Sequence, residues 1–358
     1  LSLDSMRPTG ELVKAALDDP QQLSDAELQQ LAFYSWYDND KALPEGTSPE
    51  LFNSLYKVAV ERNPKAAARF YLQYLVMLAG SEGEFENADP APLEGILADP
   101  ELLFASWDYL TSYPERIIAA VEDVLMAEDR LRYVLVDVVL QNRHNENLST
   151  TKQLAAWNTY FALQAGEGEE VPAEIVAAIL ADGTAADEKT AGSHERQSVI
   201  DSVSSTYLDA GLVDEARALL REEIGTSKTP YYFMSTLAYL EEKEGNMDVA
   251  VDWRRKAYEN STGPATRIRW WARYAQAVVR MVPENPEAID SAAMAIFSEA
   301  ELLGQIFAGA NFRNLQNTTN ALQGWDEEYN AGESKLGSYH GAIKSLCGEQ
   351  APGSSAYV

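Results

Sequence analysis

Apolar residues recur at helical spacing along almost the whole chain, and the alternating apolar and polar runs that predict β-strands are scarce. Helix starts are marked by residues that cap a first turn. Ser24 precedes Asp25-Ala26-Glu27, and Ser48 precedes Pro49-Glu50, so each helix would begin with a capping hydroxyl ahead of an apolar face. The pattern therefore predicts an all-α fold.

Three segments interrupt the helical pattern. They are rich in proline, glycine or acidic residues, which favour loops, and they cover residues 80–92, 166–172 and 181–192. The last two bracket a predicted helix over 173–180 and are the best candidates for a domain boundary. We therefore expect an N-terminal helical region of divergent helix pairs over residues 1–172, and tetratricopeptide-like helix pairs with C-terminal capping helices over residues 173–358. One continuous array is the alternative.

Two segments of the C-terminal half match each other with a shift of about 34 residues, the tetratricopeptide period. A glycine between two helices relieves the turn, and an alanine five residues later lets the paired helices approach closely. The alternative is an accidental helical hairpin. The repeat predicts an α-α superhelix, that is, a tetratricopeptide-like helical array. The matched positions are Val203, Gly211, Asp214, Ala216 and Leu219 in the first segment, and Leu237, Gly245, Asp248, Ala250 and Trp253 in the second.

Charge and hydropathy exclude several classes of partner. The 358 residues include 28 Lys and Arg against 56 Asp and Glu, and the formal net charge of −28 repels phosphate backbones and anionic lipid. A solvated acidic surface is the simpler reading of the same charge. The longest apolar runs, such as residues 71–79, are too short to span a bilayer. We expect no nucleic-acid partner and no membrane insertion.

Residues that carry chemistry are few. Cys347 is the single cysteine, the three histidines lack metal-ligand spacing, and no phosphate-binding glycine loop or nucleophile elbow occurs. The Asp38-Asn39-Asp40 run lacks the glycine of a calcium loop, so a helix-ending turn is the better interpretation. We assign no catalytic residue, no metal site and no cofactor.

One predicted helix, residues 264–281, gathers arginines and aromatic residues in an otherwise acidic chain. Arginine forms forked hydrogen bonds with carboxylates, and aromatic side chains anchor interfaces. The alternative is that the arginines neutralise neighbouring acidic helices. Helical spacing puts Arg269, Arg273, Gln276 and Arg280 on one stripe, Ile268, Trp271, Ala272, Ala275 and Val279 on a core-facing stripe, and Trp270 and Tyr274 near the border. The candidate binding residues are Arg267, Arg269, Trp270, Arg273, Tyr274 and Arg280.

Two segments carry a resemblance to a known family. Residues 23–40, which read LSDAELQQLAFYSWYDND, and residues 263–270, which read GPATRIRW, resemble the helical C-terminal region of bacterial envelope proteins of the thioredoxin family. In that family a thioredoxin domain precedes a long helical extension, which would explain the start at Leu1. The resemblance implies a periplasmic location, with the cytoplasm as the alternative. The family's Trp-Cys-x-x-Cys redox element is absent from this sequence, so no catalytic residue is carried over.

These observations favour a non-catalytic helical repeat domain that binds a protein or peptide, as an accessory to a thioredoxin-like thiol-disulfide oxidoreductase. The expected partner is a protein, a peptide or an attached thioredoxin-like domain. The alternative is a helical enzyme that uses clustered carboxylates in a cleft between helices.

Overall fold

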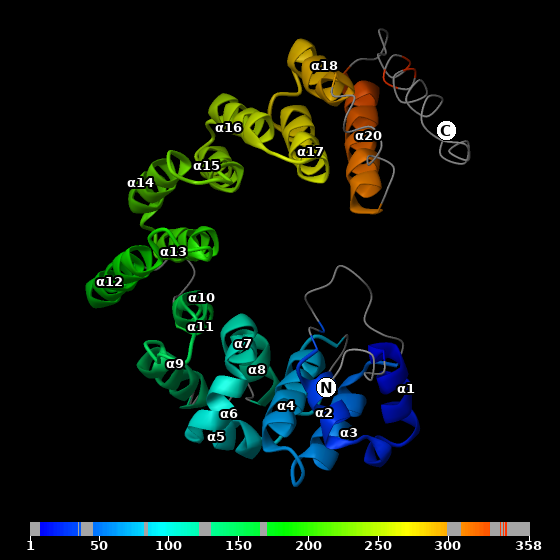
Figure 1. The fold of residues 1–358 in the computed structure, drawn as a ribbon, viewed down its shortest axis with the longest axis vertical. Coiled ribbons are helices and arrows are strands. Elements are labelled where there is room, and N and C mark those ends of the chain that lie inside the picture. Colours follow the sequence, from blue (N-terminus) through cyan, green and yellow to red (C-terminus); the bar gives the residue numbers. More distant parts are fainter. Residues whose placement is uncertain are drawn as a thin grey trace. The chain divides into compact units, whose positions relative to one another are not determined.

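The fold is described by a computed structural model that covers residues 8–34, 36, 46–81, 85–121, 130–164, 170–298 and 309–329, together with residues 337, 339 and 341. All regular secondary structure in these ranges is helical and none of it is strand, so the predicted all-α helical array is confirmed (Figure 1). The helices form two compact units, Leu1–Leu212 and Val213–Val358. The domain boundary expected after residue 172 lies N-terminal to this division and stays a prediction.

The first unit consists mainly of short helices that pack against their neighbours in the chain. Its α3 and α4 form a hairpin, and Phe52 and Phe70 from these two helices are fully buried in one apolar cluster with Leu12 and Leu28. The helices are α1 (Thr9–Asp18), η2 (Pro20–Gln22), α2 (Asp25–Ala32), α3 (Pro49–Ala59), α4 (Pro64–Leu78), α5 (Ala91–Ala98), α6 (Pro100–Ala105), α7 (Trp107–Ser112), α8 (Pro114–Val121), α9 (Arg130–Asn142), α10 (Thr150–Leu154), α11 (Ala156–Leu163), α12 (Ala173–Thr190) and α13 (Arg196–Asp209).

Both helix starts predicted from capping residues are confirmed. The Ser24 hydroxyl accepts a hydrogen bond from the Glu27 amide, and the Glu27 carboxylate accepts one from the Ser24 amide at 2.9 Å, which forms a complete capping box at α2. At α3, the Ser48 hydroxyl accepts from the Leu51 amide at 3.2 Å, with Pro49 in the first turn. These starts depend on residues within one turn of each other, so the local sequence is enough to place them.

The loop predicted over residues 181–192 is wrong, because α12 continues to Thr190. Gly183 sits in the middle of this helix and not at its end. A Cβ atom there would lie 2.7 Å from Cζ of Tyr207 on α13, so the missing side chain allows the two helices to approach closely. The surrounding alanines are strong helix formers, and they outweigh the single glycine.

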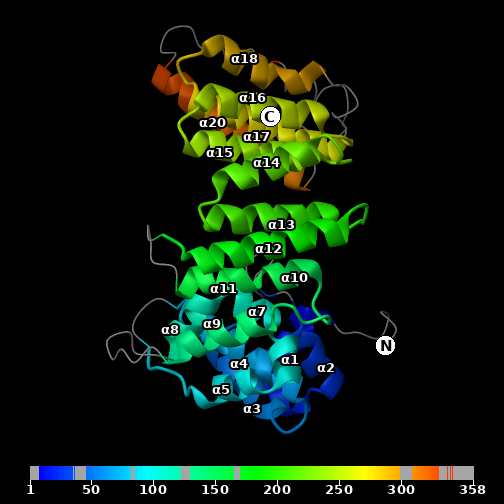
Figure 2. The ribbon, with the colours of Figure 1, turned by 90° about the vertical axis from the view of Figure 1, so that its left-hand side faces the viewer.

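The second unit is also built from helices, and most of them are longer than most helices of the first unit. Successive helices from α15 to α18 pack against one another, and α20 packs against α17 (Figures 1 and 2). No helix within the described ranges combines the length and apolar character needed to cross a bilayer. The helices are α14 (Val213–Ile224), α15 (Tyr231–Lys243), α16 (Met247–Asn260), α17 (Pro264–Met281), α18 (Pro286–Met294), η3 (Ala295–Ser298) and α20 (Gly309–Tyr329).

The predicted repeat is visible in the backbone. Gly211 and Gly245 end α13 and α15 with φ values of +76° and +81°. After each glycine, an amide bonds back five residues, from Leu212 to the Tyr207 carbonyl and from Asn246 to the Glu241 carbonyl, both at 2.8 Å. This is the hydrogen bond that closes a Schellman motif, in which glycine relieves the strain of the left-handed residue. The matched alanines, Ala216 and Ala250, are fully buried.

Helix α17 lies at the centre of the second core. Trp271 is buried and its indole donates to the Ala292 carbonyl at 2.9 Å. The expectation that Trp270 and Tyr274 lie near the border of the buried stripe is wrong, because they are only 1% and 8% exposed. The reason is that α17 packs against α16 on one side and against α18 and α20 on others, so most of its circumference is covered.

Candidate functional site

A pocket of about 420 Å³ opens between α15, α16 and α17 in the second unit. Three of its lining side chains are arginines, which is unusual in a chain with a formal charge of −28. We call it the arginine pocket. Its residues are Ser235, Thr236 and Tyr239 from α15, Arg254 from α16, and Arg273, Gln276, Ala277 and Arg280 from α17.

Helical spacing explains how two of the three helices supply this lining. On α15, Ser235 and Tyr239 are four residues apart and therefore share a face. On α17, Arg273 and Arg280 are seven residues apart, which is about two turns, so they point in the same direction. Helix α16 packs against both α15 and α17, and residues from all three helices line the same pocket.

Arg254 is the most confined cation of the pocket. Its guanidinium donates to the hydroxyl of Ser235, and among the described residues it forms no salt bridge. Burial lowers the pKa of Arg254, and the nearby charges of Arg273 and Arg280 lower it further, while Glu242 acts in the opposite direction. The guanidinium therefore lies where its positive charge is incompletely balanced by the protein.

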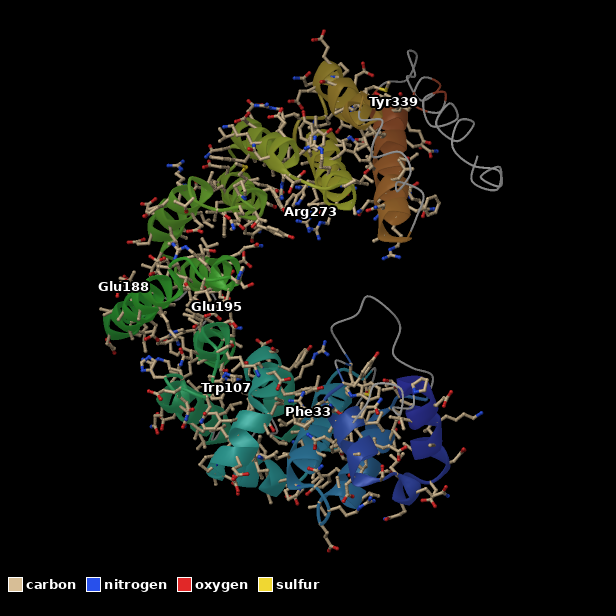
Figure 3. All side chains as sticks on the ribbon, viewed as in Figure 1. Phe33, Trp107, Glu188, Glu195, Arg273 and Tyr339 are labelled. Carbon is tan, nitrogen blue, oxygen red and sulfur yellow. The ribbon has the colours of Figure 1, made fainter. Side chains whose placement is uncertain are left out.

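Arg273 lines the same pocket from α17, and Figure 3 labels its position on that helix. Its guanidinium carbon is 4.8 Å from the ring centroid of the buried Trp270, a cation–π contact that orients the side chain. Partial burial lowers the pKa of Arg273, and the charge of Arg269 lowers it further. No carboxylate in the described part of the chain forms a salt bridge with Arg273.

Arg280 differs from the other two because it has an acidic partner. Both of its terminal nitrogens donate to the Glu242 carboxylate of α15. These hydrogen bonds raise the pKa of Arg280 and lower that of Glu242, so both groups are held in their charged forms. With one salt-bridged carboxylate against three guanidinium groups, the arginine pocket has surplus positive charge.

The structure separates the six candidate residues predicted from sequence. Arg273 and Arg280 line the arginine pocket. Arg269 lies next to them and donates to the Tyr232 hydroxyl at 2.9 Å. Arg267 instead donates to the Ser261 carbonyl at 2.8 Å, just beyond the end of α16, which is a structural contact. Trp270 and Tyr274 belong to the core.

The sequence analysis missed the residues that α15 and α16 contribute. Arg254 had a weak signal, because it begins the basic run Arg254-Arg255-Lys256 in the second repeat. Nothing local marks Ser235, Thr236 or Tyr239 as lining residues, since their role depends on the helix that packs opposite.

A second polar cluster joins helices of the first unit. The Asp182 carboxylate on α12 accepts hydrogen bonds from Arg143 at 2.8 Å and from the Trp157 indole at 3.0 Å, and it lies 2.7 Å from the His144 imidazole. With these partners, Asp182 holds helices of the first unit together, which is a structural role. Among the described residues, no group of three or more His, Cys, Asp or Glu side chains is arranged to hold a metal ion. Cys347 and the Asp38–Asp40 run lie outside the described residues.

Comparison of the chain with protein-family models, with curated protein sequences and with solved structures gave no match. The chemistry of the arginine pocket is therefore the basis for a functional hypothesis.

Proposed function

We propose that this chain is a non-catalytic helical repeat domain that binds an acidic segment of a partner protein or peptide in the arginine pocket. The observation that carries the proposal is the unbalanced charge of Arg254 and Arg273 in a chain with a net charge of −28. A cation that is removed from water without a partner is costly, and a ligand carboxylate would offset that cost with charge-assisted hydrogen bonds.

The remaining lining residues suit a peptide. Ser235, Thr236 and Gln276 provide hydroxyl and amide groups that can hydrogen-bond a peptide backbone. Tyr239 is exposed at the same face of α15, where an aromatic ring provides rigid contact area. The pocket therefore combines charge recognition with contacts to the rest of a bound chain.

Catalysis has less support from the same geometry. Burial raises the pKa of Asp201 and Asp209, the change expected of an acid catalyst, but neither residue lines the arginine pocket. Glu242, whose carboxylate accepts hydrogen bonds from the lining residue Arg280, has a lowered pKa. These features favour ligand binding over acid–base chemistry.

We further propose that the partner is linked to a thioredoxin-like thiol-disulfide oxidoreductase, either as an attached domain or as one of its protein substrates, and that the chain acts in the periplasm. This part of the proposal rests on the resemblance of residues 23–40 and 263–270. Cross-linking of the chain in a bacterial envelope extract, followed by mass spectrometry, tests it. Recovery of partners without any thioredoxin-like protein would contradict it.

The pocket itself is tested with fluorescein-labelled hexaglutamate, titrated with the full chain at low salt and followed by fluorescence anisotropy. Because the protein is acidic overall, long-range repulsion opposes the binding of an acidic peptide, and affinity must come from a local cationic site. We expect saturable binding that Arg273→Glu weakens by about tenfold or more, since an attraction is replaced by a repulsion.

Arg255→Glu is the matched control, because it makes the same change of charge on α16 outside the pocket, where Arg255 pairs with Asp252 and Glu259. The helical circular dichroism of both variants should equal that of wild type. Equal loss of binding in both variants, or no binding by wild type, would overturn the proposal.

A further inference from the structure

A second pocket, of about 390 Å³, lies in the first unit and is surrounded by aromatic rings. We call it the aromatic pocket. Rings from α6 and α7 and from the residues after α2 share its wall with three charged groups. Its lining residues are Phe33, Tyr34, Trp36, Arg69, Phe104, Ala105, Asp108, Tyr109, Ser112, Tyr113 and Lys152.

Its polar centre is an ion pair with fixed geometry. Two nitrogens of Arg69 donate to the two oxygens of Asp108 at 2.6 and 2.8 Å, and Arg69 also donates to the carbonyls of Ala32 and Ala105 at 2.8 Å. The Arg69 side chain is only 6% exposed, whereas that of Asp108 is 47% exposed. The carboxylate is thus held in one orientation and still has lone pairs directed to solvent.

Several aromatic rings of the pocket pack against Arg69 or against another ring. The Arg69 guanidinium carbon lies 4.3 Å from the Phe33 ring centroid and 4.8 Å from that of Tyr109, so these two rings already have a cation against them. Phe33 nevertheless remains 43% exposed. Phe104 and Tyr113 are partly exposed, and they rest on the buried Trp107 and Tyr109 with centroids 5.9 Å apart in each pair. Exposed ring surface therefore surrounds a fixed carboxylate.

The charged groups of the pocket impose no electrostatic cost on a neutral ligand. Arg69 and Asp108 neutralise each other, and Lys152, which is exposed, adds a single positive charge. Trp36 and Tyr109 are buried, so the ring surface offered to a ligand comes from Phe33, Tyr34, Phe104 and Tyr113. A pyranose sugar is neutral, and it has an apolar C–H face with hydroxyl groups around its edge.

We propose that the aromatic pocket binds a neutral saccharide, with a sugar ring against the exposed aromatic side chains and its hydroxyl groups bonded to Asp108, Lys152 and Ser112. The volume lies within the range of small-ligand sites, which combine aromatic walls with a few oriented polar groups. This site is independent of the arginine pocket, because all residues of the aromatic pocket lie in the first unit and all residues of the arginine pocket lie in the second.

The test is a titration of the full chain with maltotriose, cellotriose, chitotriose and mannotriose, each to about 10 mM, where even a Kd near 1 mM gives saturation. Binding is followed by intrinsic fluorescence and by isothermal calorimetry. We expect at least one of these saccharides to bind wild type. Phe33→Ala should weaken that binding by about tenfold, the scale of a lost aromatic contact.

Ser112→Trp provides a second variant that leaves the Arg69–Asp108 pair intact and fills the pocket from an exposed position at the end of α7. It should abolish saccharide binding. Two controls should bind as wild type: Tyr133→Ala, which removes an exposed ring of α9 outside the pocket, and Arg273→Glu in the second unit.

Failure of all four saccharides to bind would overturn the proposal, as would binding that both Phe33→Ala and Ser112→Trp leave unchanged. A proline-rich decapeptide is titrated in parallel. If the peptide binds wild type, Ser112→Trp abolishes its binding, and no saccharide binds, then the pocket is a peptide site and the saccharide assignment is wrong.

Discussion

Glu242 on α15 accepts hydrogen bonds from both terminal nitrogens of Arg280 on α17, a partner 38 residues away in sequence. The pair joins two helices that line the arginine pocket. The same carboxylate also counteracts the lowering of the Arg254 pKa by its cationic neighbours. Glu242 therefore both connects the helices and limits the positive charge offered to a ligand.

Replacement of Glu242 by glutamine should strengthen the binding of acidic peptides. Removal of this negative charge frees Arg280, and we expect hexaglutamate affinity to rise by roughly fivefold at low salt. The free energy of unfolding should fall by about 1 kcal/mol, because the Arg280 side chain is 58% exposed although that of Glu242 is only 20% exposed. Fluorescence anisotropy measures the first effect and urea denaturation the second. Glu244→Gln is the control, since Glu244 pairs with Arg217 outside the pocket. Weaker binding by Glu242→Gln would show instead that Glu242 positions Arg280.

Trp270→Ala should destabilise the protein, although sequence alone suggested a binding role for this residue. Trp270 is 1% exposed in the core of the second unit, and truncation of a buried tryptophan costs about 3–5 kcal/mol. The indole nitrogen is buried and has no hydrogen-bond partner among the residues that the structure describes, which places the expected loss at the lower end of that range. Thermal unfolding followed by circular dichroism measures it, with the exposed Tyr239→Ala as the control. A variant that unfolds at the wild-type temperature would contradict the prediction.

The Arg69–Asp108 pair should make stability depend on pH at the acidic end. Burial opposes ionisation of Asp108, but the hydrogen bonds and charge of Arg69, together with the charge of Lys152, lower its pKa below the ordinary 3.8. Because the pKa of Asp108 is lower in the folded state, the ion pair contributes stability that is fully present above pH 3.8. This contribution is lost as the pH falls through the pKa of the folded state.

We therefore expect Asp108→Asn to be less stable than wild type at neutral pH, and the difference in unfolding free energy to shrink as the solution becomes more acidic than pH 3.8. Urea denaturation over this range checks it. Asp214→Asn on the exposed side of α14 is the comparison variant and should change stability little. A constant difference between Asp108→Asn and wild type at every pH would refute the assignment.

Gly183→Ala should destabilise α12, against the usual preference of helices for alanine. The new Cβ would lie 2.7 Å from Cζ of Tyr207, and overpacking of this kind costs about 1–3 kcal/mol, more than the gain of about 1 kcal/mol from helix propensity. Gly95→Ala in α5 has no heavy atom within 4 Å of the added Cβ and should be stabilising by about 0.5–1 kcal/mol. Thermal melting of the two variants should therefore shift in opposite directions, and a rise in both would be inconsistent with close packing at Gly183.

Features that depend on neighbours in the chain were predictable. The caps at Ser24 and Ser48 act within one helical turn, and the glycine turns at Gly211 and Gly245 are closed by bonds over five residues. Gly183 shows the limit of this reasoning. Its sequence context resembles a turn, but its role is to let Tyr207 of another helix approach.

The sequence alone determined that this chain is helical, where its strongest caps and turns fall, and that Arg273 and Arg280 share one face of a helix, because these properties follow from local backbone energetics and helical periodicity. Only the tertiary structure decided that Arg254 joins those arginines and that Trp270 lies in the core. Both outcomes depend on which helices pack together, and side chains separated by tens of residues become neighbours only when apolar faces on different helices are buried against each other.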